Sequence, residues 1–349
     1  MKTAPLDAGH VISARAPVRN ADLGGWRDTR LFDQGYVLNF AIRLYTYVTL
    51  EPTAGEEIEL EGQDIGELER IADIRAIEYK GALSLVKAAI ASSNMPTGGF
   101  RMAVRSEAPP ASGLGSSAAV AVAALGALHR LNGRFQLPYR VAVEAQRLET
   151  EILGQECGVQ DQLCSACGGV NFIDVHYPEA RVMPPSLAPQ TLLELESRSL
   201  VVYTGKSHFS SDTHRSVIAN YVAGDPGTVE AMARLNETAQ WGLDALLQDD
   251  LDAYAEALNY NWQQQKRLHS SITTERVEEM HAAVTGAGAI GFKLNGAGAG
   301  GTAMILCRHN SVHAVRDCLR QRFAEAMVYP MKLDLGPHQG LQVWVRKSD

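Results

Sequence analysis

A glycine- and serine-rich stretch, Ala111-Ser-Gly-Leu-Gly-Ser-Ser-Ala-Ala119, lies between a predicted strand and a predicted apolar helix. Apolar residues alternate with others at 100–106, which indicates the strand, and alanine, leucine and valine fill 118–131, which favours a buried helix. A helix N-terminus leaves backbone N–H groups unpaired and carries a partial positive charge, and glycines let that backbone approach an anion closely. The junction therefore predicts a phosphate-binding loop; a serine-capped helix after a flexible turn is the alternative.

A second glycine-rich stretch, Lys293-Leu-Asn-Gly-Ala-Gly-Ala-Gly-Gly301, holds four glycines within six residues. It lies between predicted strands at 289–294 and 302–307. Because a hairpin needs fewer glycines, we expect this loop to press against a nucleotide or against the first glycine-rich loop. A loose hairpin loop is the alternative.

A third stretch near the start of the chain, Arg15-Ala-Pro-Val-Arg-Asn-Ala-Asp-Leu-Gly-Gly-Trp-Arg-Asp-Thr29, combines three arginines, two aspartates and a Gly-Gly pair. Arginine forks suit phosphate groups, and aspartates suit the hydroxyls of a sugar. The stretch therefore indicates a polar acceptor site, with a solvated strand end as the alternative.

Two carboxylates have a sequence context that suits phosphoryl transfer. Glu149 lies late in a helix predicted at 138–153, and Asp161 follows the loop at 154–160. Mg²⁺ prefers one or two carboxylates together with phosphates and water, and transfer to a hydroxyl needs a group that takes its proton. We expect the two acids to converge on one pocket, although a single acid among the 40 in this chain is more often a surface residue.

Composition excludes several other classes of protein. The chain has 32 basic and 40 acidic side chains, a net charge of −8, so nucleic acid and anionic membranes are not expected as main partners. No apolar run approaches the roughly 20 residues of a membrane helix, and the first residues hold no apolar secretory segment. The odd, sparse set of five cysteines suits a reducing cytoplasm. The expected state is a cytoplasmic monomer or homodimer.

The length of 349 residues suggests two domains. Four prolines between 177 and 189 mark the predicted boundary, which divides the chain into 1–190 and 191–349. A helix is predicted at 68–93 from the spacing of its apolar residues. Mixed strands and helices, partly in hairpins, predict an α+β fold. The second half contributes helices at 212–222, 228–247, 251–268, 274–285 and 312–326, and strands at 199–204, 328–334 and 341–345.

Taken together, the order of these motifs resembles the GHMP kinase superfamily, which includes galactokinase and the homoserine, mevalonate and phosphomevalonate kinases. The resemblance rests on Ala16–Arg19 with Gly24–Asp28, on Pro110–Ala119, on Cys157–Gln162 and on Lys293–Gly301. It implies a two-domain α+β GHMP kinase fold, with an N-terminal ribosomal-protein-S5-like domain that binds ATP and a C-terminal ferredoxin-like domain. It also implies phosphoryl transfer that depends on ATP and Mg²⁺.

The resemblance assigns a role to each matching position. Asp161 would orient or deprotonate the acceptor hydroxyl, and Arg19 would lower the pKa of that hydroxyl or stabilise the transferred group. Ser117 and Glu149 would bind Mg²⁺. The residues implied to bind ATP are Pro110, Ser112, Gly113, Leu114, Gly115, Ser116, Ser117, Gly298 and Gly300.

Within the superfamily the chain looks most like the fucokinase and heptose 7-phosphate kinase branch, and Gly25-Trp26 stands where galactokinases have Glu-His. The implied acceptor is a sugar or sugar phosphate, a heptose 7-phosphate or a fucose-like sugar. The implied acceptor site comprises Arg15, Gly25, Trp26, Asp28, Lys206 and His208, the last two facing a phosphate already on the sugar or capping a helix. Two alternatives stay open: a non-sugar acceptor such as mevalonate, and a regulator that binds sugar and ATP without turnover.

Overall fold

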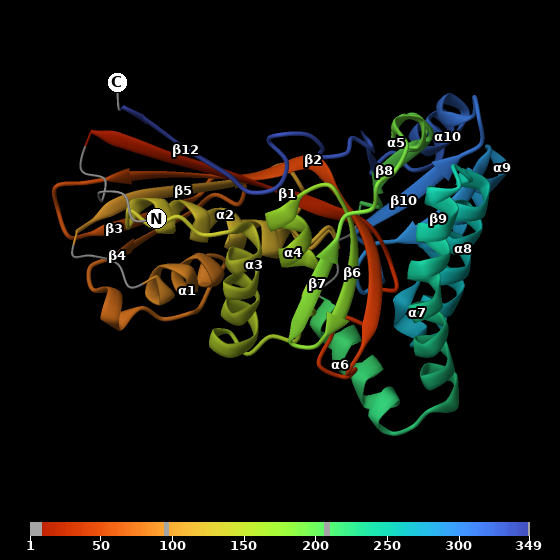
Figure 1. Cartoon of the computed structure of the whole chain (residues 1–349), viewed down its shortest axis with the longest axis horizontal. Coiled ribbons are helices and arrows are strands. Elements are labelled where there is room, and N and C mark those ends of the chain that lie inside the picture. Colours follow the sequence, from red (N-terminus) through yellow and green to blue (C-terminus); the bar gives the residue numbers. More distant parts are fainter. Residues whose placement is uncertain (1–8, 94–97, 206–209, 348–349) are drawn as a thin grey trace.

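The computed structural model describes residues 9–93, 98–205 and 210–347. In these residues, the first sheet is mostly antiparallel and has the strand order β12-β1-β2-β5-β3-β4 (Figure 1). Strand β6 pairs with β2, and β7 pairs with β6. Its strands are β1 (His10–Leu23), β2 (Gly35–Pro52), β3 (Ile58–Gly62), β4 (Glu67–Ile71), β5 (Phe100–Ser106), β6 (Val170–His176), β7 (Glu179–Met183) and β12 (Gln342–Lys347).

Helix α2 (Ser116–Leu131) is the central helix of this part of the chain. It packs against β1 and β2, and α1 (Ser84–Ser92), α3 (Pro138–Arg147) and α4 (Gln160–Cys167) pack around it. Six of the sixteen residues of α2 are alanines, and all six are buried, which lets the helix approach the sheet closely. Gly115, just before the helix, has a φ of +68°, a conformation that glycine adopts at little cost.

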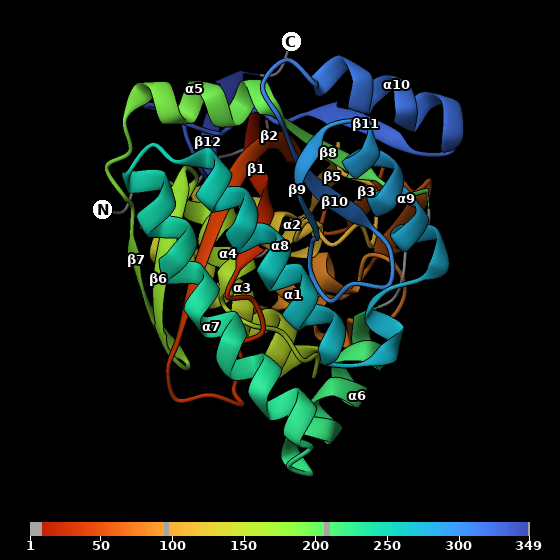
Figure 2. The same cartoon turned by 90° about the vertical axis from the view of Figure 1, so that its right-hand side faces the viewer.

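A second sheet has the order β11-β8-β10-β9, with the strands β8 (Ser199–Tyr203), β9 (Ala289–Leu294), β10 (Thr302–Cys307) and β11 (Met327–Pro330). Helices α7 (Pro226–Leu247) and α8 (Leu251–Arg267) form a pair that faces the viewer in Figure 2. Helix α8 packs on β9 of this sheet and α7 packs on β2 of the first sheet, so the helix pair connects the two sheets. The other helices of this part are α5 (Pro189–Arg198), α6 (Ser210–Val222), α9 (Glu275–Gly286) and α10 (Val312–Arg322).

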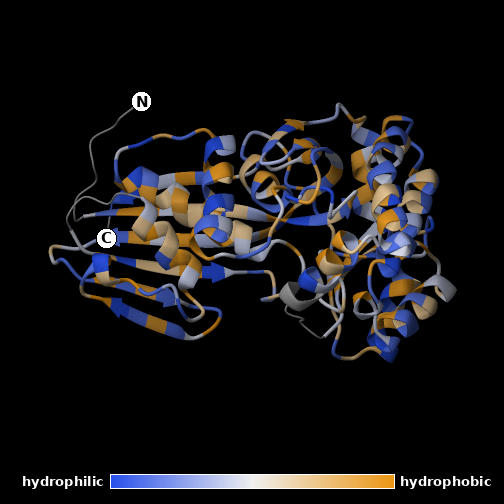
Figure 3. Cartoon of the chain, turned by 90° about the horizontal axis from the view of Figure 1, so that it is seen from below, coloured by the Kyte–Doolittle hydropathy of each residue, from blue (hydrophilic) through white to orange (hydrophobic). Residues whose placement is uncertain are grey.

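The two sheets lie in two lobes along the longest axis of the molecule (Figure 3). The molecule has two apolar cores. The larger one lies around the first sheet and also takes in Val201, Met304 and Leu306 from the second. Trp26 and Phe32, from the loop between β1 and β2, are buried in the other core, beside the second sheet. The start of the chain therefore contributes to both cores. Among the described residues, no helix has the length and apolar character needed to span a lipid bilayer.

The predicted α+β class is confirmed, and the strands predicted at 100–106, 289–294 and 302–307 have those bounds in the structure. The helix predicted at 68–93 is wrong over its first half. Strand β4 pairs with β3 there, a 3₁₀ turn follows at Ile74–Ala76, and α1 begins only at Ser84. Ile71, Ile74 and Ile77, which give this half its helical spacing, are only partly buried against the core, and Leu68 is 56% exposed.

The proline-containing segment at 177–189 forms the turn between β6 and β7 and the approach to α5. The second sheet begins soon after it, at β8. The last strand, β12, returns to the first sheet and pairs antiparallel with β1, so that Ile12 lies opposite Val345. The chain therefore passes between the sheets twice, and a single division at 190/191 stays a prediction.

Candidate active site

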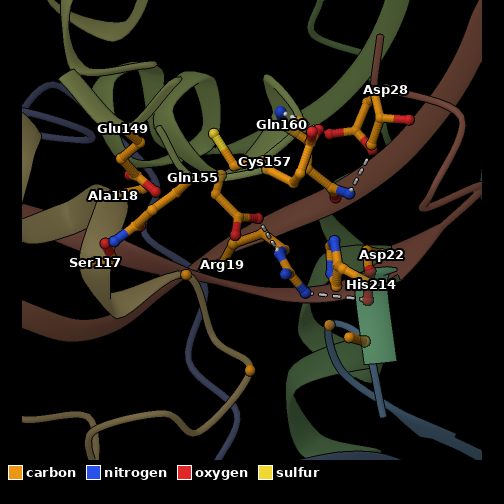
Figure 4. A pocket seen from close by; sticks show the side chains of 18 of the residues that line it. Arg19, Asp22, Asp28, Ser117, Ala118, Glu149, Gln155, Cys157, Gln160 and His214 are labelled. Carbon is orange, nitrogen blue, oxygen red and sulfur yellow. Dashed lines mark hydrogen bonds and ion pairs between the residues drawn. The ribbon is translucent and has the colours of Figure 1, made fainter. Parts of the chain in front are cut away.

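A cavity of about 650 Å³ lies where loops from both lobes meet. Its wall is formed by β1 and the loop after it, the start of α2, the residues that precede and begin α4, the start of α6, and the loop between β9 and β10. Figure 4 shows Glu149 and Ser117 at one side and Asp22 and His214 at the other, with Arg19 between them.

The two glycine-rich loops lie against each other, as the sequence predicts. The amide of Thr302 donates a hydrogen bond to the carbonyl of Ser112 at 2.7 Å. A Cβ at Gly113 would lie 2.7 Å from the carbonyl oxygen of Asn295, and one at Gly301 would lie 2.5 Å from that of Ser112. Because both glycines also have positive φ, side chains there would push the loops apart.

Asp161 lies in the first turn of α4, and its carboxylate approaches the N-terminus of α2. A Cβ at Gly115 would lie 2.9 Å from the Asp161 Cγ. The Arg19 Nε donates a hydrogen bond to the Asp161 Oδ1 at 2.8 Å. Burial alone would lower the pKa of Arg19, but Asp161 and Asp22 outweigh it and raise that pKa, so the guanidinium stays charged.

Glu149 lies in a π-helical turn, Leu148–Ile152, that continues α3; such turns often occur at functional sites. Gln162 donates a hydrogen bond to its Oε1 at 3.2 Å, and its carboxyl group also hydrogen-bonds with Ser117. Burial, with a smaller contribution from the charge of Asp161, raises the pKa of Glu149 to about 7. The site thus collects negative charge next to a helix N-terminus.

A magnesium ion fits these side chains. The hydroxyl of Ser117 and the carboxylate of Glu149 are hard oxygen donors that already lie side by side, and a cation would offset the cost of burying a charged Glu149. In the described ranges, no three His, Cys, Asp or Glu side chains are grouped so that they could hold a metal ion on their own. The pair therefore suits an ion that also takes ligands from phosphate and water.

Asp28 lies in the cavity wall, but its hydrogen bonds join it to the protein. Its Oδ2 accepts from the backbone amides of Val159 and Gln160 at 3.0 and 3.1 Å, and its Oδ1 accepts from the Gln160 Nε2 at 3.2 Å. Burial raises the pKa of Asp28 to about 6. The residue predicted to bind the acceptor therefore also holds the start of α4.

Trp26, another residue predicted to bind the acceptor, lies in the wall with a φ of +77°. Its ring packs against the imidazole of His214, with 4.5 Å between the ring centroids and 31° between the ring planes. His214 comes from α6, about 190 residues further along the chain. Burial lowers the pKa of His214, so the ring is neutral at pH 7. The ten histidines show no motif in the sequence, so the sequence did not indicate His214 as a residue of the site.

The predicted site residues fall into three groups. Those that line the cavity are Arg19, Trp26, Asp28, Gly113, Gly115, Ser116, Ser117, Glu149, Asp161, Gly298 and Gly300. Those that lie outside its lining are Arg15, Gly25, Pro110, Ser112 and Leu114. Lys206 and His208 lie outside the described residues, so the structure says nothing of the phosphate site predicted there.

Four of the five residues outside the lining make other contacts in the protein. The guanidinium of Arg15 lies over the Tyr45 ring, 4.4 Å from its centroid. Ser112 and Leu114 are fully buried and contribute backbone carbonyls, of which that of Leu114 accepts from the Arg19 amide at 2.8 Å. A Cβ at Gly25 would lie 2.7 Å from the Asp22 Oδ2, so this glycine makes room for Asp22.

A buried ion pair at the back of the cavity joins two residues that are not among the predicted site residues. The Lys293 Nζ lies 2.8 Å from the Asp22 Oδ1, and the Arg19 Nη1 lies 3.0 Å from the same oxygen. Lys293 begins the second glycine-rich motif and is 1% exposed. Its partner is 271 residues away in the sequence, so no local pattern could have linked the two.

Residues 79–169 match the family model "GHMP kinases N terminal domain", and residues 243–325 match "GHMP kinases C terminal". A D-glycero-alpha-D-manno-heptose 7-phosphate kinase of Campylobacter jejuni is 26% identical over 320 residues, which cover 87% of this chain and 93% of that protein.

A bifunctional fucokinase/GDP-fucose pyrophosphorylase of Arabidopsis thaliana is 28% identical over 344 residues, or 91% of this chain. The match spans only 31% of that longer protein. Among solved structures, a D-glycero-D-manno-heptose 1-phosphate kinase from Bacteriodes thetaiotaomicron superposes with a TM-score of 0.77 at 25% identity, and covers 95% of this chain and 98% of its own.

Both halves of the chain thus match the two halves of one family, and the solved relative has the same two-lobed architecture over almost its full length. The glycine-rich loops, the acid of α4 and the start of α2 lie together as the motifs predict. The chain belongs to the GHMP kinase family, and it is an ATP-dependent small-molecule kinase.

Proposed function

We propose that this kinase transfers the γ-phosphoryl group of ATP to a hydroxyl of a sugar or sugar phosphate, either a heptose 7-phosphate or a fucose-like sugar. The observation that carries the proposal is the position of Asp161. Its carboxylate is bound by Arg19 and lies beside the N-terminus of α2, where the backbone favours phosphate. The names of the relatives support the sugar class, and the polar wall that includes Asp28 and Gln160 suits a hydroxyl-rich molecule.

In this proposal the first glycine-rich loop holds the phosphates of ATP with its backbone N–H groups, and Ser116 adds a hydroxyl. The second glycine-rich loop supports the first from behind. Ser117 and Glu149 would hold Mg²⁺, which when bound neutralises phosphate charge. The protein thus contributes positioning and electrostatic stabilisation, the main requirements of phosphoryl transfer.

Asp161 accepts the proton of the acceptor hydroxyl or orients that hydroxyl for attack. Arg19 stays charged beside it, and its charge stabilises either the developing alkoxide or the transferred group. Trp26 and His214 form the wall from which an acceptor would approach, because their rings pack together and line the same cavity. A regulator without turnover would not need Asp161, Glu149 and Ser117 together, which favours the enzyme over that alternative.

The test is an assay of ADP release with ATP and Mg²⁺ over a panel of acceptors. The panel contains D-glycero-D-manno-heptose 7-phosphate, sedoheptulose 7-phosphate, L-fucose, D-mannose, galactose and mevalonate. We expect turnover with one of the first four and none with mevalonate. Turnover with mevalonate alone would assign the non-sugar acceptor, and ATP binding without turnover on any compound would favour the non-catalytic regulator.

A further inference from the structure

We propose that Lys293 and Asp22 are positioning residues: their buried ion pair, formed between β9 of one lobe and β1 of the other, fixes the guanidinium of Arg19 against Asp161. The inference rests on the proposed catalytic roles of Arg19 and Asp161. The inference goes further than those roles, because it makes the Arg19–Asp161 contact of the first lobe depend on Lys293 from the second lobe.

A backbone irregularity aims Asp22 away from its own sheet. The pairing of β1 with β2 shifts register between Asn20 and Leu23, and Ala21 within this bulge has a φ of +55°. A bulge of this kind commonly redirects a side chain next to an active site. The bulge is held from the second lobe, because the Asn295 Oδ1 accepts from the Ala21 amide at 2.9 Å and the Asn295 Nδ2 donates to the Asn20 Oδ1 at 2.9 Å.

One oxygen of Asp22 serves two cations. The Lys293 Nζ lies 2.8 Å and the Arg19 Nη1 lies 3.0 Å from the Asp22 Oδ1. Arg19 uses its other edge for Asp161, with 2.8 Å between Nε and Oδ1. The side chains of Lys293, Asp22 and Arg19 are all at least 95% buried, so solvent does little to screen their charges from one another.

Lys293, Asp22, Arg19 and Asp161 form a row of side chains with alternating charge. The alternation explains why Lys293 affects the position of Arg19. With Lys293 present, Asp22 shares its charge between two cations and Arg19 remains divided between two carboxylates. Without Lys293, the full charge of Asp22 acts on Arg19 alone and draws the guanidinium toward Asp22 and away from Asp161. A shift of about 1 Å in such a contact can reduce turnover by about 100-fold.

The ammonium group of Lys293 hydrogen-bonds to Asp22 and lies behind the cavity wall. It is absent from the residues that line the cavity, and its other hydrogen bond goes to the carbonyl of Leu294 at 2.9 Å. Its removal should therefore lower kcat and leave the KM for ATP nearly unchanged, which a general loss of fold would not do.

The test compares Lys293→Met with the double variant Asp22→Asn/Lys293→Met. The single variant leaves Asp22 with Arg19 as its only cation, and we expect kcat to fall by about 10- to 100-fold, with the KM for ATP within about twofold of wild type. The double variant removes both charges, so no carboxylate draws Arg19 away from its contact with Asp161. We expect it to recover at least about tenfold in kcat relative to the single variant. Lys332→Met, which breaks an exposed ion pair with Glu196, is the matched control and should keep wild-type kcat.

Crystal structures of the two variants supply a measurement that does not depend on activity. We expect the Arg19–Asp161 contact to be lost in Lys293→Met and restored in the double variant. A single variant that keeps this contact overturns the inference, as does one that is folded and has wild-type kcat, or a double variant that is folded but no faster than the single one. A wild-type protein that phosphorylates no acceptor would instead overturn the proposed function, whatever the variant structures show.

Discussion

Asp28 accepts a hydrogen bond from the backbone amide of Gln160, the residue directly before Asp161, at 3.1 Å. Together with the bond from the Val159 amide, this places a carboxylate at the start of α4. A carboxylate in that position pairs helix N–H groups that would otherwise lack partners and interacts favourably with the helix dipole. The orientation of Asp161 thus depends on a side chain from the loop after β1 as well as on Arg19.

Gly158→Ala tests this dependence. A Cβ at Gly158 would lie 1.8 Å from the Asp28 Oδ2, so the carboxylate must leave its place. We expect kcat to fall at least about tenfold, because α4 loses its N-terminal partner and Asp161 moves. The matched control is Gly286→Ala at the end of α9, where a Cβ would meet nothing within 4 Å. It should keep full activity and gain about 0.5–1 kcal/mol in the free energy of unfolding. Equal activity of the two variants would contradict the role of Asp28.

Asp161→Asn tests the proposed proton acceptor. The amide keeps the size of the side chain but cannot take a proton, so we expect kcat to fall by about 10²- to 10⁴-fold while ATP still raises the melting temperature. Asp174→Asn on β6, which lies outside the cavity lining, is the control. Near wild-type turnover in Asp161→Asn would show that the proposed assignment is wrong.

Glu149 gives a prediction for stability as a function of pH. Its pKa is raised from 4.5 to about 7, so the folded protein retains a proton that the unfolded chain has already lost in that range. Without nucleotide or metal, the free energy of unfolding therefore decreases as pH rises from about 4.5 to 7 and stays lower above that. Asp28, with a pKa of about 6, adds to the same trend at its lower end.

Glu149→Gln should remove the larger part of this decrease, which thermal melting between pH 5 and 8 would measure. At pH 7.5, Mg²⁺ with ATP should raise the melting temperature of the wild type by more than that of Glu149→Gln, by on the order of a few degrees. Glu151→Gln changes an exposed acid in the same turn and should behave as the wild type. An unchanged pH trend in Glu149→Gln would contradict the proposed ionisation of this group.

His214→Ala tests the wall formed by α6. Loss of the ring removes the packing partner of Trp26, and we expect the KM for the acceptor to rise several-fold while the KM for ATP stays the same. His313→Ala, an exposed histidine on α10, is the control. A change confined to the KM for ATP would place His214 on the nucleotide side of the cavity.

The sequence predicts the parts of this site whose chemistry is local. Close contacts and positive φ require glycine at positions 113, 115 and 301. Such requirements concentrate glycines in short segments, which can be recognised in the sequence. The acids Glu149 and Asp161 could be selected because each lies at a recognisable place relative to a helix. Both line the cavity, and their roles stay predictions.

Other parts could not be predicted, because they depend on pairs that only the tertiary fold creates. Asp22 and Lys293 belong to different sheets, and His214 of α6 meets Trp26, which comes from the loop after β1, far earlier in the chain. The segment at 68–93 shows the opposite problem. Its apolar spacing fits a helix, but the backbone groups of β4 gain partners from the neighbouring strand β3, and pairing there outweighs the helical pattern.

The pairing of β12 with β1 has a consequence for how this protein is made. Strand β1 is among the first described segments to leave the ribosome, and the strand that covers its outer edge comes last, after the whole second lobe. During synthesis that edge has unpaired N–H and C=O groups, which invite contact with other chains. The first sheet is thus completed only after the second lobe has been made, and a nascent chain arrested before residue 342 would leave the edge of β1 open.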